Sequence, residues 1–128
     1  MRLLIDTHIL IWWTSNLSQL PTTVQDSLAD GSNEIFVSAV SAWEIALKVR
    51  LGKLHFDANF LADFDANVRG LSFHPIDVNS AQMIAGAQIQ SPHKDPFDRM
   101  LAGQALVEQM AIVTADPAFR SLGVQIVW

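Results

Sequence analysis

The sequence contains no cysteine and few charged residues. Without cysteine among its 128 residues, neither a disulfide framework nor a thiolate metal site is possible. Charged residues make up 16% of the chain and hydrophobic residues 50%, a composition that excludes an intrinsically disordered protein. The length is that of one ordinary domain. We therefore expect a single domain over residues 1–128, with the cytoplasm as the default compartment.

Basic residues are scarce as well, and no long apolar run is present. Eight Lys and Arg against 13 Asp and Glu give a formal net charge of -5, which argues against binding nucleic acid by charge alone. The apolar N-terminal segment is interrupted by Asp6 and His8, and it falls short of the ~20 apolar residues that span a membrane. It also lacks the basic segment and the cleavage site of a signal peptide. If RNA is the substrate, something must offset the acidic charge.

The pattern of apolar residues predicts strands and helices in alternation. Short apolar runs predict strands over residues 2–6, 34–38, 71–76, 111–114 and 124–127. Helical spacing predicts a helix capped by Thr7, one between Pro21 and Gly31, and others over 41–51, 58–69, 79–89 and 97–110. Parallel strands need crossover connections, which are usually helices. We therefore expect an α/β fold with a parallel sheet flanked by helices.

Four acidic residues stand where a buried or ligand-binding position is expected. Asp6 ends the first predicted strand and Asp116 closely follows the fourth, at the strand ends where open α/β sheets bind ligands. Glu44 and Asp98 lie in line with the apolar stripes of their helices. A buried carboxylate is costly unless it is paired or binds a metal. Because oxygen ligands suit Mg²⁺ or Mn²⁺ better than zinc, we interpret the four acids as ligands of a hard cation.

Each acid taken alone also has an ordinary structural interpretation. These are a helix N-cap for Asp6, an i,i+4 ion pair with Lys48 for Glu44, stabilisation of a helix dipole for Asp98 and an Asp-Pro turn for Asp116. No buried basic partner is evident for the four. Coordination of a hard cation explains all of them together, which capping alone does not.

Four short motifs carry a resemblance to a known family. They are Leu-Leu-Ile-Asp-Thr-His at 3–8, Val-Ser-Ala-Val-Ser-Ala-Trp-Glu-Ile at 37–45, His-Lys-Asp-Pro-Phe-Asp-Arg at 93–99 and Val-Thr-Ala-Asp at 113–116. In this order and spacing, the chain resembles the PIN-domain nucleases, specifically the bacterial toxins of VapC type, over nearly its whole length. The resemblance implies a Rossmann-like parallel sheet whose acidic pocket is formed by Asp6, Glu44, Asp98 and Asp116.

The resemblance also implies an activity and partners. Proteins of this kind are usually Mg²⁺- or Mn²⁺-dependent endoribonucleases, hydrolases that arrest translation by cutting RNA and are neutralised by a cognate antitoxin. We therefore expect an RNA substrate, an antitoxin partner and a homodimer, with the four acids both catalytic and metal-binding. Two alternatives stay open. One is another metal phosphohydrolase, and the other is a PIN-fold module that acts in binding or RNA processing without toxin activity.

Residues near the four acids receive supporting hypotheses. Asp95 is expected to cap the helix that begins near Asp98, and Thr7 and Thr114 are candidates for hydrogen bonds to a carboxylate or a ligand water. His93 is a candidate for protonating the leaving group, although a structural role is favoured. Basic residues near the acids form a candidate rim for RNA phosphates: Lys48, Arg50, Lys53, Lys94 and Arg99. For three tryptophans, a place in the core or a dimer interface is favoured over base stacking: Trp12, Trp13 and Trp43.

Overall fold

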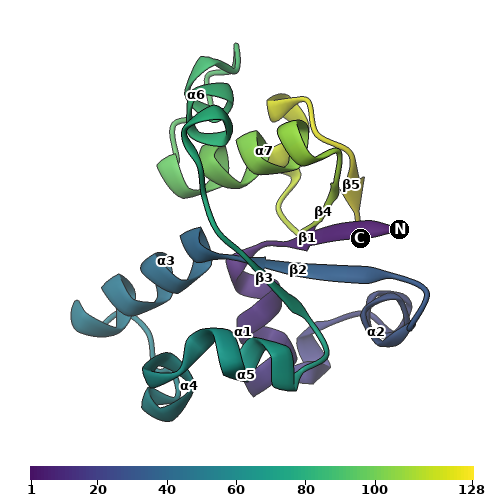
Figure 1. Ribbon diagram of the computed structural model, residues 1–128, viewed down its shortest axis with the longest axis vertical. Helices are drawn as coiled ribbons and strands as arrows, with labels where there is room; N and C mark the ends of the chain where they lie inside the picture. Colours follow the sequence, from purple (N-terminus) through teal and green to yellow (C-terminus); the bar gives the residue numbers. More distant parts are fainter.

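The computed structural model describes residues 1–128 and is built on one five-stranded sheet (Figure 1). Every pair of neighbouring strands is parallel, and the spatial order is β3-β2-β1-β4-β5. The strands are β1 (Arg2–Ile5), β2 (Glu34–Ser38), β3 (His74–Ile76), β4 (Ala111–Val113) and β5 (Ile126–Val127). Because the order reverses between β1 and β4, the crevice beyond their carboxyl ends is where an α/β sheet is expected to bind ligand.

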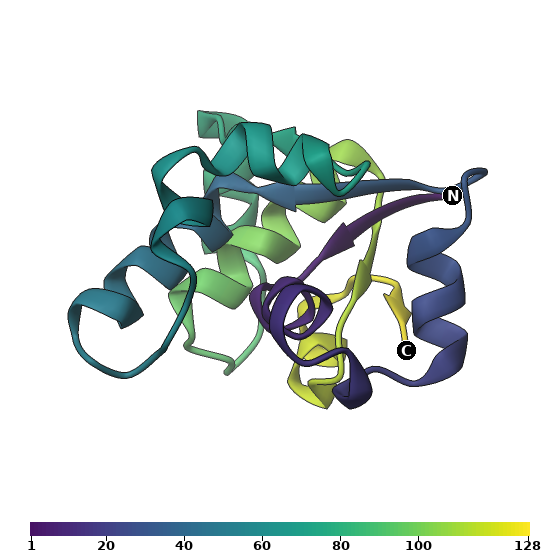
Figure 2. The ribbon, with the colours of Figure 1, turned by 90° about the horizontal axis from the view of Figure 1, so that it is seen from below.

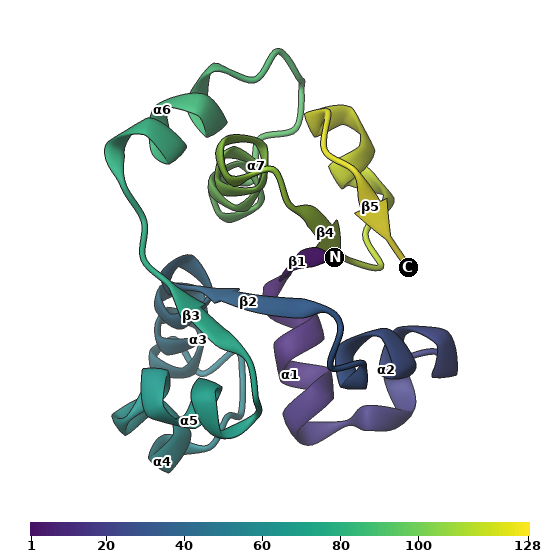
Figure 3. The ribbon, with the colours of Figure 1, turned by 45° about the vertical axis from the view of Figure 1, so that its right-hand side comes forward.

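Helices cover both faces of the sheet, which confirms the predicted α/β fold (Figure 3). They are α1 (Thr7–Ser15), α2 (Thr22–Ala29), α3 (Ala39–Arg50), α4 (Ala58–Ala62), α5 (Phe64–Gly70), α6 (Ser80–Gln88) and α7 (Pro96–Glu108), with 3-10 turns η1 (Leu17–Gln19) and η2 (Pro117–Leu122). In the view of Figure 3, α6 and α7 lie above the sheet, and α1, α2, α4 and α5 lie below it. None of these helices has the length and apolar character needed to span a membrane.

The hydrophobic core is divided into two clusters, one on each face. Leu3 and Ile5 of β1 belong to the cluster under α1 and α2, whereas Leu4 belongs to the cluster under α7. Successive residues of a strand point to opposite faces, so β1 is apolar on both sides, as a central parallel strand must be. Figure 2 shows β1 and β2 running toward the starts of α1 and α3. The first turns of these helices therefore lie at the crevice.

The boundaries of several elements differ from the predicted ones. The helix predicted over 58–69 is two helices, because Asp63 leaves the helical conformation (φ -139°, ψ 60°). The strand predicted from Leu71 begins at His74, since Ser72 has a positive φ of 64° in the turn after α5. At the start of α1, the cap is Asp6 and not Thr7. In α3 the helix starts early because the Ser38 side chain accepts a hydrogen bond from the Val40 N–H at 3.0 Å.

Close packing of α6 on α7 sets the position of α7 over the sheet. The two helices cross at Gly86 and Gly103, where a Cβ on either residue would overlap the backbone of the other helix. A buried amide network continues the contact. Gln104 accepts from the Ser38 hydroxyl and donates to the carbonyl of Asp77 and to Gln82 Oε1, both at 3.1 Å. These contacts fix the helix that carries Asp98.

Candidate active site

The four acids named from the sequence line one pocket beyond the carboxyl ends of β1 and β4. Its volume is about 100 Å³, and Phe119 is its only hydrophobic lining residue. Asp6 directly follows β1, Glu44 lies on α3, Asp98 lies in the first turn of α7, and Asp116 precedes η2. Residues up to 110 positions apart in the sequence thus meet at the reversal of strand order, as expected for a ligand site.

Asp6 is buried and held by two hydrogen bonds. Its Oδ1 accepts from the Ile9 N–H at 3.0 Å, which caps α1, and its Oδ2 accepts from the Thr114 hydroxyl. The residue is 6% exposed. Burial raises the pKa of Asp6 above its usual value, and the hydrogen bond from Thr114 opposes that shift. The capping interpretation therefore holds, and the same carboxylate also faces the pocket.

Glu44 is equally buried, and both of its oxygens have partners. The Thr7 hydroxyl donates to Oε1 at 2.7 Å and lies 3.0 Å from the Ser41 hydroxyl, while the Lys48 ammonium pairs with Oε2. The i,i+4 ion pair is therefore present, and it lies inside the pocket rather than on an open surface. Ser41 is a member of this group that sequence reasoning missed, although it lies one helical turn before Glu44.

Asp98 stands at the outer side of the pocket and is half-buried. Its Oδ2 lies 2.8 Å from His93 Nε2, and its backbone N–H donates to Asp95 Oδ1 at 3.0 Å. Asp95 is thus the cap of α7, as expected. Burial is the main reason why the pKa of Asp98 rises to about 6; the charges of Asp95 and Asp116 add to the rise and His93 opposes it.

Asp116 is exposed and caps η2, because its Oδ1 accepts from the Ala118 N–H at 2.9 Å. Its own N–H donates to Thr114 Oγ1 at 3.0 Å. The Thr114 hydroxyl in turn donates to Asp6. One threonine therefore links the two acids that follow β1 and β4, in the supporting role suggested for it.

Comparison with known families assigns the chain to one of them. The family model for the PIN domain matches residues 3–125. The chain belongs to the PIN-domain family. Among solved structures with its fold is VapBC2 from Rickettsia felis bound to a promoter DNA fragment, at 15% identity and a TM-score of 0.73, covering 99% of this chain and 98% of the other.

Two further solved structures share the fold of this PIN domain. FitAcB from Neisseria gonorrhoeae has a TM-score of 0.65 at 18% identity and covers 98% of this chain and 96% of the other. VapBC-1 from nontypeable Haemophilus influenzae has a TM-score of 0.66 at 15% identity, with 99% and 97% covered. A comparison with curated proteins finds no significant match. At these identities the likeness establishes the fold.

The donor atoms of the PIN-domain pocket fit a hard divalent cation. Carboxylate and hydroxyl oxygens dominate the lining, and the acids outnumber the single lysine. Burial raises the pKa of Asp6 and of Asp98, and a bound cation would favour the ionised form of both carboxylates. No three acidic or histidine side chains stand together as a ready-made ligand set. Binding a cation would therefore require rotation of side chains, including those paired with Lys48 and His93.

The basic residues proposed as a phosphate rim have separate positions in this PIN domain. Only Lys48 lines the acidic pocket. Arg99 instead donates to four backbone carbonyls, those of Ala87, Ile89, Ser91 and His93, and so clamps the loop before α7. His8, to which sequence reasoning gave no role, lines the pocket. Its position two residues after Asp6, in the first turn of α1, was the available signal.

The three tryptophans named from the sequence lie in different surroundings. Trp13 packs against Phe73 with ring centroids 5.7 Å apart, and Trp12 lies between His8 and Trp128. Both are partly buried against the core, as favoured from the sequence. Trp43 differs from them, since it is 60% exposed on α3.

Proposed function

We propose that this PIN domain is a metal-dependent endoribonuclease that acts as the toxin of a toxin-antitoxin pair. The observation that carries the proposal is the meeting of Asp6, Glu44, Asp98 and Asp116 in one pocket. The VapC-type motifs of the sequence supply those same four residues. The solved structures of similar fold, named VapBC2, VapBC-1 and FitAcB, add support for a cognate antitoxin as partner.

The four carboxylates have different parts in the proposed reaction. Asp6, Asp98 and Asp116 would hold Mg²⁺ or Mn²⁺, and Glu44 would ligate the ion or orient the attacking water. A divalent ion bound there lowers the pKa of water and offsets the charge of the RNA phosphate. Thr114 keeps Asp6 and Asp116 in register through its hydroxyl. Thr7, in the first turn of α1, holds the Glu44 carboxylate in place by donating its hydroxyl to Oε1.

His93 is assigned to orienting Asp98 rather than to protonating the leaving group. Its Nε2 contacts Asp98 Oδ2 at 2.8 Å, and its backbone N–H donates to Ser91 Oγ at 3.2 Å. A histidine that hydrogen-bonds a metal-ligating carboxylate fixes the direction of that carboxylate. Lys48 is placed to balance the charge of Glu44 when no cation is bound.

Cleavage by the purified protein tests the proposal. Single-stranded and structured RNAs are incubated with Mg²⁺, Mn²⁺ or EDTA, and the Asp98→Asn variant is compared with wild type. The matched control is Asp26→Asn, an exposed acid on α2 outside the pocket. We expect cleavage that needs the metal, falls by at least ~10²-fold in Asp98→Asn and is unchanged in the control. Expression of wild type, but not of Asp98→Asn, is expected to arrest growth.

The alternatives predict other results of the same assay. Cleavage of DNA or of small phosphate esters, with RNA left intact, would identify a different metal phosphohydrolase. Absence of cleavage by folded protein that binds Mn²⁺ would favour a binding module. Cleavage that persists in Asp98→Asn would remove this residue from the site.

A further inference from the structure

A second pocket lies next to the acidic one, and α3 and α7 contribute residues to both. On α3, Trp43 directly precedes Glu44; on α7, Phe97 directly precedes Asp98. In each pair, the acid lines the acidic pocket and the aromatic residue lines the second pocket. Adjacent Cα atoms are about 3.8 Å apart, so neighbouring residues of the same two helices line the two pockets. The pockets have no lining residue in common, and they lie on adjacent sides of these helices.

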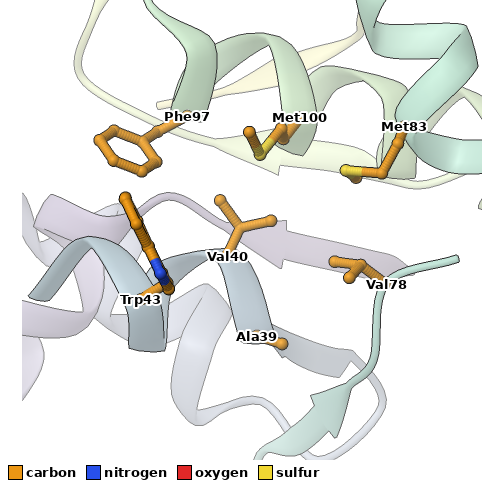
Figure 4. Close-up of a pocket in the computed structure, with 7 residues that line it drawn as sticks. All are labelled: Ala39, Val40, Trp43, Val78, Met83, Phe97 and Met100. Carbon is orange, nitrogen blue, oxygen red and sulfur yellow. The ribbon is translucent and has the colours of Figure 1, made fainter. Parts of the chain in front are cut away.

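The second pocket is apolar and open enough to take a ligand. Its volume is about 420 Å³, and all seven residues that line it are hydrophobic (Figure 4). At one end the rings of Trp43 and Phe97 lie with centroids 5.3 Å apart and planes tilted by 44°. Val40 and Met100 line the middle of the pocket, and Met83 lies beyond them. Trp43 packs against Phe97 and is still 60% exposed, so much of its indole surface is open to a ligand.

Basic side chains flank the apolar pocket at both ends. A neighbouring depression shares Trp43 with it and is lined by Arg50. Another shares Met83 and Met100 and is lined by Lys94 and by Arg99, whose guanidinium donates to backbone carbonyls of the loop before α7. No acidic residue lines any of the three depressions. This track of positive, apolar and positive character is complementary to a nucleic-acid strand, whose phosphates alternate with flat apolar bases.

We propose that Trp43 and Phe97 form a stacking subsite for one unpaired base of the RNA, next to the phosphodiester held at the acidic pocket. The proposal rests on the nuclease function above and names the part of the substrate recognised beside the cut. Stacking on an aromatic face is possible for every base. Apart from the indole N–H of Trp43, the lining has no side-chain N–H or O–H group. The subsite therefore detects whether an unpaired base is present and how large it is, with little recognition of its hydrogen-bonding edge.

A protein segment is the competing occupant of an apolar pocket. The basic flanks and the position of Trp43 and Phe97 next to Glu44 and Asp98 favour RNA, because a strand that leaves the acidic pocket across α3 and α7 passes these two rings. A peptide would gain from the apolar area in the same way with any large apolar residue at position 43. A base requires the aromatic face, and this difference makes the two occupants separable.

The test combines protein variants with abasic RNA. Short fluorescent single-stranded RNAs carry one abasic position, moved stepwise past the cut site, and are cleaved by wild type, Trp43→Ala, Trp43→Leu and Trp43→Phe. Leu106→Ala, at an exposed residue of α7 outside these pockets, is the control. In wild type we expect one abasic position beside the cut to lower kcat/KM by roughly 5- to 150-fold.

The Trp43 variants give the decisive comparison. Trp43→Ala and Trp43→Leu are expected to lose a similar factor on intact RNA and nothing more on the abasic RNA, while Trp43→Phe keeps most of the activity. If the loss caused by the abasic position and the loss caused by Trp43→Ala add up in the combined experiment, the proposal is overturned. Full activity of Trp43→Leu would overturn it as well. Abasic insensitivity together with a change in sedimentation of Trp43→Ala would show instead that this face joins protein chains.

Equilibrium binding separates failure of the subsite from failure of the nuclease function. The same RNAs are titrated in EDTA at low salt and followed by fluorescence anisotropy, so no cleavage is needed. Binding that depends on the same base and on Trp43 supports the subsite even if no RNA is cut. If the RNA does not bind, or binds equally well without the base and without Trp43, the subsite is overturned whether or not RNA is cut.

Discussion

The two walls of the acidic pocket are built in different ways. On the inner wall, Asp6 and Glu44 are each 6% exposed and receive hydrogen bonds from the neutral hydroxyls of Thr114 and Thr7. On the outer wall, Asp98 is half-buried and Asp116 is exposed. The inner acids are part of the fold, since one caps α1 and the other joins α1 to α3. The outer acids lie at the surface, where the negative charge of Asp116 makes ionisation of Asp98 less favourable.

This difference shows how a folded protein can hold several acids together without cancelling their charge. A hydroxyl donor fixes the direction of a carboxylate and leaves its negative charge for a cation. Lys48 and His93 are the only basic partners of the four acids, one on each wall. We therefore expect substitutions of the inner acids to lower both stability and cleavage, and those of the outer acids to lower cleavage without a comparable loss of stability.

Two substitutions of Asp6 separate its parts in folding and catalysis. Asp6→Ala removes the cap of α1 and the partner of Thr114, so we expect cleavage to fall by at least ~10²–10³-fold and stability to fall by about 1–2 kcal/mol. Asp6→Asn keeps an acceptor for Ile9 and should lose cleavage without losing stability. Cleavage rates and urea unfolding measure both. Equal stability of the two variants would show that the cap is unimportant.

The outer wall depends on the crossing of α6 and α7. A Cβ at Gly103 would overlap the backbone of Gln82 and Gly86, which cannot rotate away as a side chain can. We expect Gly103→Ala to cost roughly 1–3 kcal/mol and to shift α7 with Asp98. Gly31→Ala is the control, because nothing lies within 4 Å of a Cβ there. Equal urea midpoints for the two variants would contradict the close packing.

The inner wall can be weakened without touching an acid. Thr7→Val keeps the shape of the side chain but leaves Glu44 Oε1 without its hydroxyl donor, and an unsatisfied buried acceptor costs about 1–3 kcal/mol. Thr7→Ser restores the donor and should recover most of the loss in stability and cleavage. If Thr7→Ser is as impaired as Thr7→Val, the methyl packing and not the hydrogen bond is what matters.

The smallest expected effect is a gain in stability at the outer wall. The pKa of Asp98 is about 6 when folded and 3.8 as the reference value, so the folded protein binds more protons between those pH values. Its stability therefore falls as pH rises from about 4 to 6. In EDTA at pH 7.5 we expect Asp98→Asn to unfold a few degrees higher than wild type, with the difference vanishing near pH 4. A lower unfolding midpoint for Asp98→Asn than for wild type at pH 7.5 would contradict the raised pKa of Asp98.

Local patterns were sufficient to predict the α/β alternation and to select the four acids. Asp6 and Asp116 are recognisable because strand ends can be read from short apolar runs, and Glu44 because a helix period reveals an acid on the inward face. Asp63 shows the limit, since no periodicity marks the single residue that breaks a helix. The partners of each acid were harder to foresee. Thr7 and Ser41 are 34 positions apart and meet only because α1 and α3 pack together.

The apolar pocket was beyond sequence reasoning for the same reason. Its walls come from α3, from α6 and the segment before it, and from α7, and only the packing of these elements creates a space between them. For Trp43 the sequence predicted a place in the core or a dimer interface, and its 60% exposure rules out the core. Its exposure follows from its place on the face of α3 opposite the buried Ile45.

Titration of Mn²⁺ into the metal-free protein, followed by calorimetry, tests most directly whether both walls hold one cation site. Wild type is compared with Asp6→Asn from the inner wall, Asp98→Asn from the outer wall and Asp26→Asn as control. We predict saturable binding in wild type and control, and affinity lowered at least ~10-fold by each pocket variant. Undiminished Mn²⁺ binding in Asp6→Asn or Asp98→Asn would contradict a shared site.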